Sequence, residues 1–363
     1  MNEASKVLIV GPSWVGDMVM AQSLYQLLKS TNPETEIHVL APPWSRPVLE
    51  RMDQVTRAVE LPAAHGELAL RRRYEVGRRL RTERYARAIV LPRSLKAALV
   101  PFFARIPIRT GYRGEHRYGV INDMRRLDPV VLDQTVKRFV ALGPTQEGMP
   151  LPPPAEPRLR TDESSLAQVK RRLRLPAAAE VVAMMPGAEY GDAKRWPLES
   201  YADLAGRLAN VGVDVWILGS EKERPLGQAI AVSANHENVR NLCGRTTLGD
   251  VVDLLGAAKV AVTNDSGLMH VAAAVRTHVV ALYGSTSPAM TPPLTSSKSV
   301  FHLALECSPC FQRECPLGHL RCLRDIAVDD VLSRVITALG DPGAGVRGSA
   351  HGRGIASGTT DRP

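Results

Sequence analysis

The sequence predicts an α/β protein of two Rossmann-like domains, whose parallel sheets face each other across a cleft. Three observations predict this fold class. Short apolar runs alternate with helical patterns, which is typical of βαβ units. The alternation stops at a stretch rich in Pro and Gly (143–157), which reads as a linker, and then restarts. Polar, glycine-bearing loops follow several predicted strands, where sheets of this kind bind ligands.

The first domain is predicted to span residues 1–157, with the linker at 143–157. It opens on a short apolar run, Lys6–Val10, that predicts a buried parallel strand. The loop Gly11–Asp17 then leads into a helical pattern. The elements expected after this loop are a helix at Met18–Leu28, strands at Glu36–Leu40 and Val55–Leu61, a basic helix at Arg71–Arg84, a strand at Ala88–Leu91 and an apolar helix ending at Phe103.

The second domain is predicted to span residues 158–340, and the alternation restarts within it. Its expected helices are Asp162–Leu173, Leu198–Val211, one ending at Ala257, and Val328–Leu339. Its expected strands are Val181–Met185, Val213–Leu218, Val239–Cys243, one beginning at Val260, and Thr277–Tyr283. The tail 341–363 contains almost no large apolar residues and is expected to be disordered.

One stretch carries a local signal for ligand binding. Val260–Ala274 reads as a strand, the tight loop Thr263–Gly267 and a helix. Such a junction leaves backbone N–H groups and the positive end of the helix dipole free, which suits a phosphate. His270 lies one turn inside this helix and could reach the same ligand. The alternative is an ordinary capped helix with a surface histidine.

Composition and charge narrow the class of protein. Hydrophobic residues make up 44% of the chain, enough for sizeable cores. No window reaches the ~18 unbroken apolar residues of a membrane helix, and the N-terminus lacks a signal-peptide pattern, so a cytoplasmic protein is expected. The net charge is +9, and residues 1–150 hold 23 Lys and Arg against 15 Asp and Glu. An anionic partner is therefore expected for the first half. With aromatics at only 5%, a nucleic acid is not the expected partner.

Three charged residues follow predicted strands and are candidates for chemistry. Asp17 opens a helix, where it could act as a general base toward a hydroxyl or merely cap the helix. Lys194 could balance phosphate charge or be an ordinary surface lysine. Glu221 could bind ribose hydroxyls or belong to a turn. Their shared placement past strand ends is the stronger argument for function.

Five segments together resemble the bacterial lipopolysaccharide heptosyltransferases of glycosyltransferase family 9. All occur in family order between Lys6 and Leu339. They are Gly11–Met18, Leu91–Lys96, Arg109–Gly111, Pro186–Pro197 and Thr263–Ala274.

This resemblance implies a GT-B fold, with the acceptor on the first domain and ADP-heptose on the second. It implies an inverting, metal-independent transfer of L-glycero-D-manno-heptose from ADP-heptose to the first heptose of heptosyl-Kdo2-lipid A, with no required cofactor. By this resemblance Asp17 is the base and Lys194 faces the diphosphate. The implied donor-binding residues are Glu221, Asp265, Ser266, Gly267 and His270.

The resemblance also implies an acidic acceptor presented at the cytoplasmic face of the inner membrane. The basic first half fits such an acceptor. Candidate acceptor-binding residues are Ser13, Gly16, Arg93, Lys96, Arg109, Arg113 and Arg117. The Arg71–Arg84 helix could rest on anionic lipid headgroups or be a solvated face. Two alternatives remain: a family 9 transferase for a different linkage, and a non-catalytic nucleotide-sugar-binding protein.

The cysteines form a separate pattern outside the family segments. Cys307, Cys310, Cys315 and Cys322 have a spacing that resembles a metal site. Disulfides are not expected in a reducing cytoplasm. A structural zinc or a labile iron–sulfur site is one interpretation, and four free thiols in a Pro-containing loop is the other.

Overall fold

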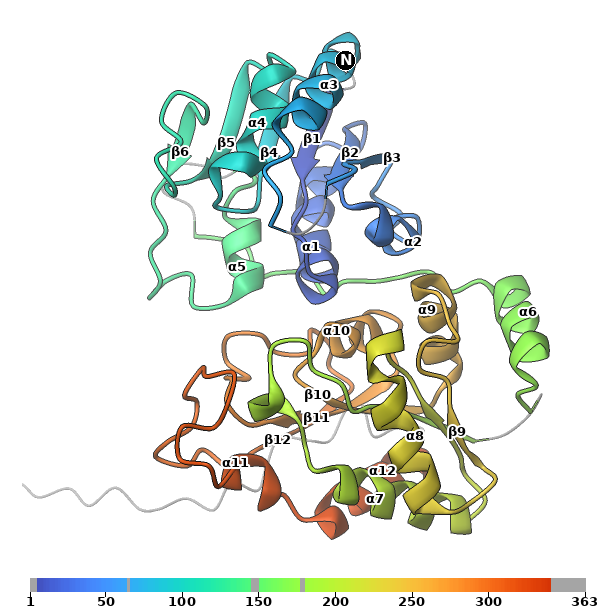
Figure 1. Cartoon of the computed structure of the whole chain (residues 1–363). Coiled ribbons are helices and arrows are strands. Elements are labelled where there is room, and N and C mark those ends of the chain that lie inside the picture. The colour runs from blue at the N-terminus through green and yellow to red at the C-terminus, as the bar shows by residue number, and fades with distance from the viewer. Residues whose placement is uncertain (1–4, 64–65, 145–149, 177–179, 341–363) are drawn as a thin grey trace, which may run out of the picture.

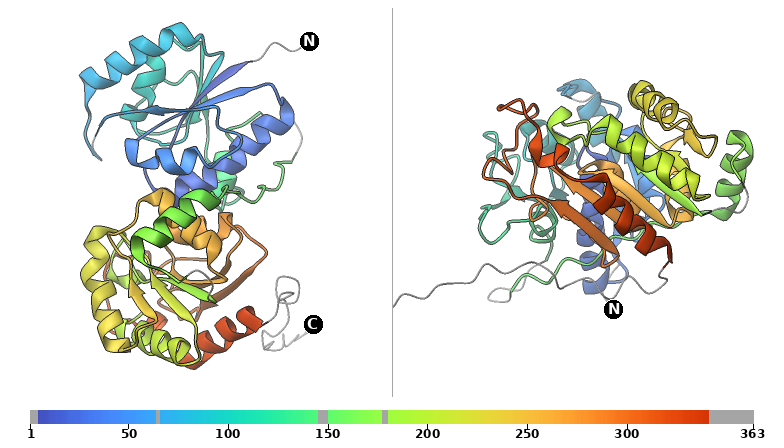
Figure 2. Two further views of the ribbon diagram at one scale, coloured as in Figure 1. Left: turned by 90° about the vertical axis from the view of Figure 1, so that its right-hand side faces the viewer. Right: turned by 90° about the horizontal axis from the view of Figure 1, so that it is seen from below.

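Two parallel sheets, each in its own lobe, form the protein. A computed structural model of the chain describes residues 5–63, 66–144, 150–176 and 180–340. The tail that was expected to be disordered and the linker residues 145–149 lie outside these ranges. In the described residues each sheet has six strands. The two lobes are stacked, and an extended segment runs between them (Figures 1 and 2).

Both sheets have the same doubly wound strand order. The first is β3-β2-β1-β4-β5-β6 and the second is β12-β11-β10-β7-β8-β9, so each starts in its centre and extends to both sides. The strands of the first sheet are β1 (Lys6–Val10), β2 (Glu36–Ala41), β3 (Arg57–Glu60), β4 (Arg87–Val90), β5 (Ile108–Tyr112) and β6 (Asp123–Arg125). Those of the second are β7 (Val181–Met185), β8 (Asp214–Ile217), β9 (Val239–Asn241), β10 (Val260–Asn264), β11 (His278–Tyr283) and β12 (Lys298–His302).

Helices connect these strands. In the first domain they are α1 (Val15–Thr31), α2 (Arg46–Leu49), α3 (Leu70–Leu80), α4 (Leu95–Phe103) and α5 (Thr135–Val140), with 3-10 turns η1 (Pro43–Ser45) and η2 (Arg81–Glu83). In the second they are α6 (Glu163–Leu173), α7 (Leu198–Asn210), α8 (Arg224–Ala234), α9 (Leu248–Ala257), α10 (Gly267–Ala274), α11 (Arg321–Arg324) and α12 (Val328–Gly340), with η3 (Asp192–Lys194) and η4 (Glu221–Glu223).

The predicted parallel α/β architecture is confirmed, and several elements went unpredicted. The sequence patterns predict no strand for β5, β6 or β12 and no helix for α5 or α8. β6 is a three-residue strand of sequence DMR, and β12, of sequence KSVFH, has only two adjacent apolar residues and lies at a sheet edge. Neither presents the continuous apolar run that identifies a buried parallel strand.

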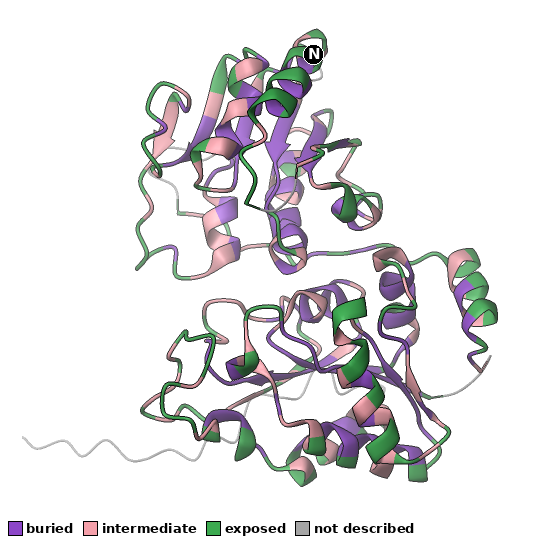
Figure 3. Cartoon of the chain, viewed as in Figure 1, coloured by how far each residue is buried: buried purple, intermediate pink, exposed green. Residues whose placement is uncertain are grey.

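Apolar packing joins the two domains as well as filling each one. One cluster of buried side chains runs from Met18 and Leu24 of α1 to Val252 of α9 and Met269 of α10. The opposite faces of the two sheets have separate clusters, one in each domain. Figure 3 shows these buried strands between exposed helix faces. Because the first cluster crosses the boundary, it helps to set how the lobes face each other.

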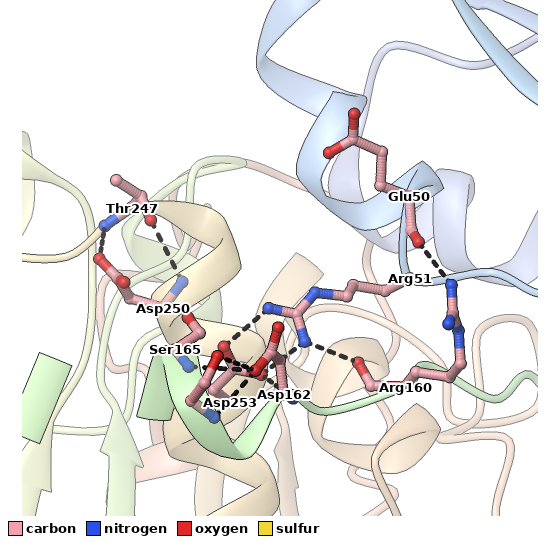
Figure 4. Close-up of polar contacts among 9 residues, drawn as sticks. Glu50, Arg51, Arg160, Asp162, Ser165, Thr247, Asp250 and Asp253 are labelled. Carbon is pink, nitrogen blue, oxygen red and sulfur yellow. Dashed lines mark hydrogen bonds and ion pairs between the residues drawn. The ribbon is translucent and has the colours of Figure 1, made fainter. Parts of the chain in front are cut away.

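A buried ion pair also links the domains at one end of the interface (Figure 4). Arg51, just after α2, donates two hydrogen bonds of 2.7 Å to the carboxylate of Asp253 on α9. The Asp253 side chain is fully buried and also accepts the backbone N–H of Asp162 at 2.8 Å. Arg51 donates further to the carbonyl of Arg160, which lies in the segment that joins the lobes. This pair therefore fastens both domains and their connection at one point.

Replacing Arg51 with methionine should destabilise the protein strongly. The change leaves the Asp253 carboxylate buried without its cation, a loss that typically costs about 3–5 kcal/mol. Urea denaturation measures the free energy of unfolding of each variant. The double variant Arg51→Met/Asp253→Leu should recover much of the lost stability, and Arg46→Met, which breaks an exposed pair with Glu50, is the control with little effect. A single Arg51→Met variant as stable as the wild type would contradict this assignment.

Candidate active site

Asp17 lies where the first domain meets the second. It occupies the first turn of α1, whose N-cap is Trp14, so it is not the capping residue that the alternative interpretation suggested. Among the described residues its carboxylate has no hydrogen-bond partner. Burial raises the pKa of Asp17 to about 6; the charge of Asp265 adds to this rise and that of Lys194 opposes it. Asp17 is therefore a weakly solvated carboxylate within reach of charges from the other domain.

Lys194 and Asp265 form a buried ion pair on the second domain. Lys194 ends the η3 turn, and its Nζ lies 2.6 Å from Oδ2 of Asp265 and 3.2 Å from the Asp265 carbonyl oxygen. The same carboxylate accepts the hydroxyl of Thr286 at 2.6 Å and that of Thr291 at 3.5 Å. Asp265 is thus occupied by groups of this chain. An ammonium has three N–H donors, so one remains beyond these two oxygen acceptors, and Nζ also lies 5.1 Å from the centroid of the Tyr190 ring.

Asp265, which the resemblance places among the donor-binding residues, contacts side chains of its own domain in this structure. Its two oxygens hold Lys194 and two threonines, so it positions the lysine. The sequence did not identify Thr286 or Thr291 as partners of Asp265. The only available signal was hydroxyl residues after a predicted strand, which is weak because such residues are common in turns.

The N-terminus of α10 faces that of α1 across the domain boundary. Ser266 is the N-cap of α10, but its side chain makes no capping bond, so it leaves the first N–H groups of the helix for other partners. A Cβ at Gly267 would lie 3.0 Å from Cβ of Val15, so this position requires a small residue. The expected phosphate-binding helix start therefore lies beside the turn that carries Asp17.

His270 and Gly16 meet at the same boundary. A Cβ at Gly16 would lie only 2.6 Å from Cδ2 of His270, so the absence of a side chain admits the imidazole. Burial lowers the pKa of His270 to about 4, and its Nδ1 has no partner among the described residues. Gly16, expected to bind the acceptor, thus lies in the domain contact. His270 is a neutral imidazole at neutral pH.

The cysteine-bearing loop supports the segment that carries Lys194. Phe311 donates its N–H to the Ser285 carbonyl at 2.7 Å and accepts the hydroxyl of Tyr190 at 2.6 Å. Ala193 donates to the carbonyl of Arg313 at 3.0 Å. A Cβ at Gly191, whose φ is +156°, would lie 2.3 Å from that same oxygen. The loop 307–322 thus holds the 190–194 segment in place.

The four cysteines of this loop are free thiols. The pKa of Cys322 is raised by burial and by the charges of the other three thiols, so the four share one neighbourhood. Backbone N–H groups at 317–320 lower the pKa of Cys315. In the part of the chain that the structure describes, no group of three or more His, Cys, Asp or Glu is arranged to hold a metal ion. The structural zinc stays a prediction.

A large cavity opens from the first domain toward the second. Its volume is about 1220 Å³. Asp17 lies in its wall, and most of the lining comes from loops that follow β1, β2 and β4. The wall contains two tryptophans and five basic residues. The cations and tryptophans that line it are Trp14, Trp44, Arg73, Arg93, Lys96, Arg138 and Lys222.

The predicted acceptor residues divide into two groups. Ser13, Arg93 and Lys96 line the cavity, whereas Arg113 is exposed outside its lining and contacts Tyr118. The expectations for Arg109 and Arg117 are wrong. Arg117 is fully buried and donates to carbonyls of Tyr112, Pro92 and Ser94. Arg109 likewise bonds to carbonyls of Ile106, Gly119 and Val120. Both guanidiniums stabilise loops, because they satisfy backbone oxygens that would otherwise lack donors.

Glu221 lies apart from the Asp17–Lys194 cluster. It is exposed at the start of η4, after β8, and pairs with Arg224 at 3.1 Å. Its neighbours Ser220 and Lys222 line the cavity. The sequence did not identify Arg73 of α3, Arg138 of α5 or Trp44 of η1 as cavity residues, because they lie on three separate elements and no local spacing relates them.

Two Rossmann domains thus enclose a cleft, with a carboxylate on one side and a cation beside a helix N-terminus on the other. Two Rossmann-like domains that face each other across such a cleft define a protein of the GT-B fold class. The family model described as glycosyltransferase family 9 (heptosyltransferase) matches residues 73–321. The chain belongs to this family.

Individual proteins similar in sequence to this chain are heptosyltransferases as well. The chain is 44% identical to lipopolysaccharide heptosyltransferase 2 of Salmonella typhimurium over 93% of its own length and 99% of the relative's. It is 44% identical to the protein of the same name from Escherichia coli, over 91% and 97% of the two chains. The solved structure of E. coli ADP-heptose LPS heptosyltransferase II matches with a TM-score of 0.82 and 42% identity, covering 92% of this chain and 98% of that one.

Proposed function

We propose that the protein transfers L-glycero-D-manno-heptose from ADP-heptose to the first heptose of the lipopolysaccharide inner core. The names of its relatives support the donor, the sugar and the second position in the core. One structural observation carries the chemistry: Asp17 lies at the domain boundary, where the charges of the Lys194–Asp265 pair of the second domain act on it. The proposal includes inversion at the transferred carbon.

In the proposed reaction Asp17 accepts the proton of the acceptor hydroxyl. The hydroxyl oxygen forms a bond to the anomeric carbon of the heptose while the bond from that carbon to ADP breaks. A direct displacement of this kind passes through an oxocarbenium-like transition state and inverts the configuration. Because burial holds the pKa of Asp17 near 6, the group is ionised at neutral pH yet basic enough to take the proton.

The second domain stabilises the leaving group in this proposal. Negative charge develops on the diphosphate as the glycosidic bond breaks. Lys194, held by Asp265, and the N–H groups at the start of α10 supply positive charge there, and this arrangement needs no metal ion. Glu221 would then serve the adenosine ribose.

The cavity suits an anionic sugar acceptor. Arg93, Lys96 and Arg138 present cations along its wall, and the tryptophans Trp14 and Trp44 offer flat apolar faces. Inner-core sugars carry carboxylates, which guanidinium and ammonium groups bind well. No helix among the described residues has the length and apolar character needed to cross a bilayer. We propose that the enzyme works as a peripheral protein at the cytoplasmic face of the inner membrane.

The test is a transfer assay with two acceptors, Kdo2-lipid A with and without its first heptose, in the presence of ADP-heptose. The product is measured by mass. Addition of one heptose to the heptosylated acceptor alone supports the proposal. Transfer to the unheptosylated acceptor would assign the first transfer instead, and binding of ADP-heptose without any transfer would favour a non-catalytic protein.

The pH dependence of transfer should reflect the ionisation of the Asp17 carboxyl. We expect kcat/KM to rise with pH through a single ionisation near 6 and to be constant above it, because the base acts as a carboxylate. His270, with its pKa lowered to about 4, should contribute nothing in this range. The measurement is kcat/KM from pH 5 to 9. A profile that stays flat through pH 6 would exclude Asp17 as the titrating base.

A further inference from the structure

The outer side of α3 and the end of α4 form an exposed apolar surface with basic residues. Leu70, Tyr74 and Arg78 follow one another at intervals of four residues, so they lie on one side of α3. Leu70 is 51% exposed and Tyr74 43%, and Figure 3 shows this side of α3 as largely exposed. A merely solvated helix face would carry polar residues at these positions.

The aromatic rings continue this surface onto α4. Tyr74 packs edge-on against Phe103 with 5.4 Å between ring centroids, and Phe103 contacts Phe102 at 5.8 Å. Phe102 is 42% exposed. Gly77 permits this contact, since a Cβ there would lie 2.6 Å from Cβ of Phe103. The two helices therefore present one continuous surface, which we call the α3–α4 surface (Leu68, Leu70, Tyr74, Arg78, Phe102 and Arg105).

The charge of this region is strongly positive. Residues 66–84 contain seven arginines and three glutamates, and residues 95–109 contain three basic residues and no acidic one. Some of the arginines pair with glutamates, as Arg71 does with Glu75. Arg78 and Arg105, by contrast, are exposed and have no ion-pair partner among the described residues. Exposed apolar side chains beside unpaired cations are the combination that binds anionic bilayers.

The α3–α4 surface lies next to the cavity. Gly66 and Arg73 line the cavity, and Leu68 and Leu70 lie between them in the sequence. Arg73 also donates to the Leu68 carbonyl at 2.7 Å, which ties the start of α3 to the cavity rim. A protein resting on a bilayer through this surface would therefore hold its cavity next to the lipid. A lipid-anchored sugar could enter without leaving the membrane.

We propose that the α3–α4 surface docks the protein on the anionic phospholipid bilayer. Leu68, Leu70, Tyr74 and Phe102 enter the headgroup region, while Arg78 and Arg105 contact lipid phosphates. This docking surface rests on the proposed function in one respect only: transfer to a lipid-anchored sugar explains why the surface lies beside the cavity. The binding itself needs neither sugar donor nor acceptor.

Vesicle flotation of the full chain tests this. The wild type should float with vesicles of equimolar phosphatidylglycerol and phosphatidylcholine but not with phosphatidylcholine alone, and high salt should weaken binding. The variant Leu70→Ser/Arg78→Glu should bind at least about tenfold more weakly. Val232→Ser/Arg171→Glu changes an exposed valine and an exposed arginine of the second domain and is the matched control.

Transfer assays separate this inference from the proposed function. The Leu70→Ser/Arg78→Glu variant should transfer normally to a delipidated, soluble acceptor and poorly to an acceptor embedded in vesicles. Equal flotation of variant and wild type, or equal binding to neutral and anionic vesicles, would overturn the docking surface. Vesicle binding in a protein without transferase activity would overturn only the proposed function.

Discussion

The variant Asp17→Asn is expected to bind ADP-heptose normally and to lose about a hundredfold to ten-thousandfold in transfer rate. Loss of a general base typically costs this much, because the acceptor hydroxyl must then lose its proton to water. The amide has the shape of the carboxylate, and Asp17 has no hydrogen-bond partner among the described residues, so little else changes. Donor binding is measured by calorimetry and transfer by product mass.

The same variant should be more stable than the wild type above pH 6. The pKa of Asp17 rises from 3.8 to about 6 in the folded protein, so ionisation of the native carboxyl costs up to about 3 kcal/mol. Below pH 4 both folded and unfolded chains hold the proton, and the difference disappears. It grows as the pH rises from 4 to 6. Urea denaturation at pH 4 and pH 8 checks the sign of the stability difference between the variant and the wild type.

Two outcomes would contradict the role of Asp17. Near-normal turnover of Asp17→Asn would exclude it as the base, and a stability gain that does not depend on pH would exclude the charged carboxylate as its cause. Asp53→Asn is a suitable control because Asp53 is an exposed aspartate of the same domain, paired with Arg160. It should leave both turnover and its pH dependence unchanged.

The second large effect is expected for Lys194→Ala. ADP should bind about tenfold to a hundredfold more weakly, since a hydrogen bond to a charged group contributes about 1.5–3 kcal/mol. Transfer should fall further than binding, because the charge on the leaving diphosphate grows in the transition state. Calorimetry with ADP and product mass measure the two losses.

Lys194→Ala should also destabilise the fold. It leaves the Asp265 carboxylate buried with only the hydroxyls of Thr286 and Thr291, and breaking a buried pair costs about 3–5 kcal/mol. The double variant Lys194→Ala/Asp265→Asn separates the two effects: it should regain stability without regaining ADP binding. Wild-type affinity for ADP in the single variant would refute the assignment of Lys194 to the diphosphate.

Local sequence patterns accounted for much of the architecture. Val181–Met185 is a strand with the predicted bounds, and α7 and α9 end within one residue of the predicted positions. These elements combine an apolar period with clear boundary residues, such as the capping box of Thr247 and Asp250. The short strand β6 was missed because three residues are too few to show a period.

For the site, the sequence located the loops but not the contacts within them. Asp17, Lys194 and Ser266 are predicted site residues because each follows a strand in a parallel sheet, where ligands bind. The partner of Asp265 was not identified, since Lys194 lies 71 positions away and no local spacing connects them. Arg109 and Arg117 were assigned wrongly because a basic residue reads the same whether it faces a ligand or a carbonyl.

The sequence by itself thus determined the alternation of strands and helices, the phosphate-suited start of α10 and the basic character of the first domain. These follow from the spacing and chemistry of neighbouring residues. Only the tertiary structure decided that Asp17 is a weakly solvated carboxylate, that Asp265 positions Lys194 and that Arg51 ties the two domains together. Burial and ion pairing are interactions through space, and they exist only once distant segments have been packed against each other.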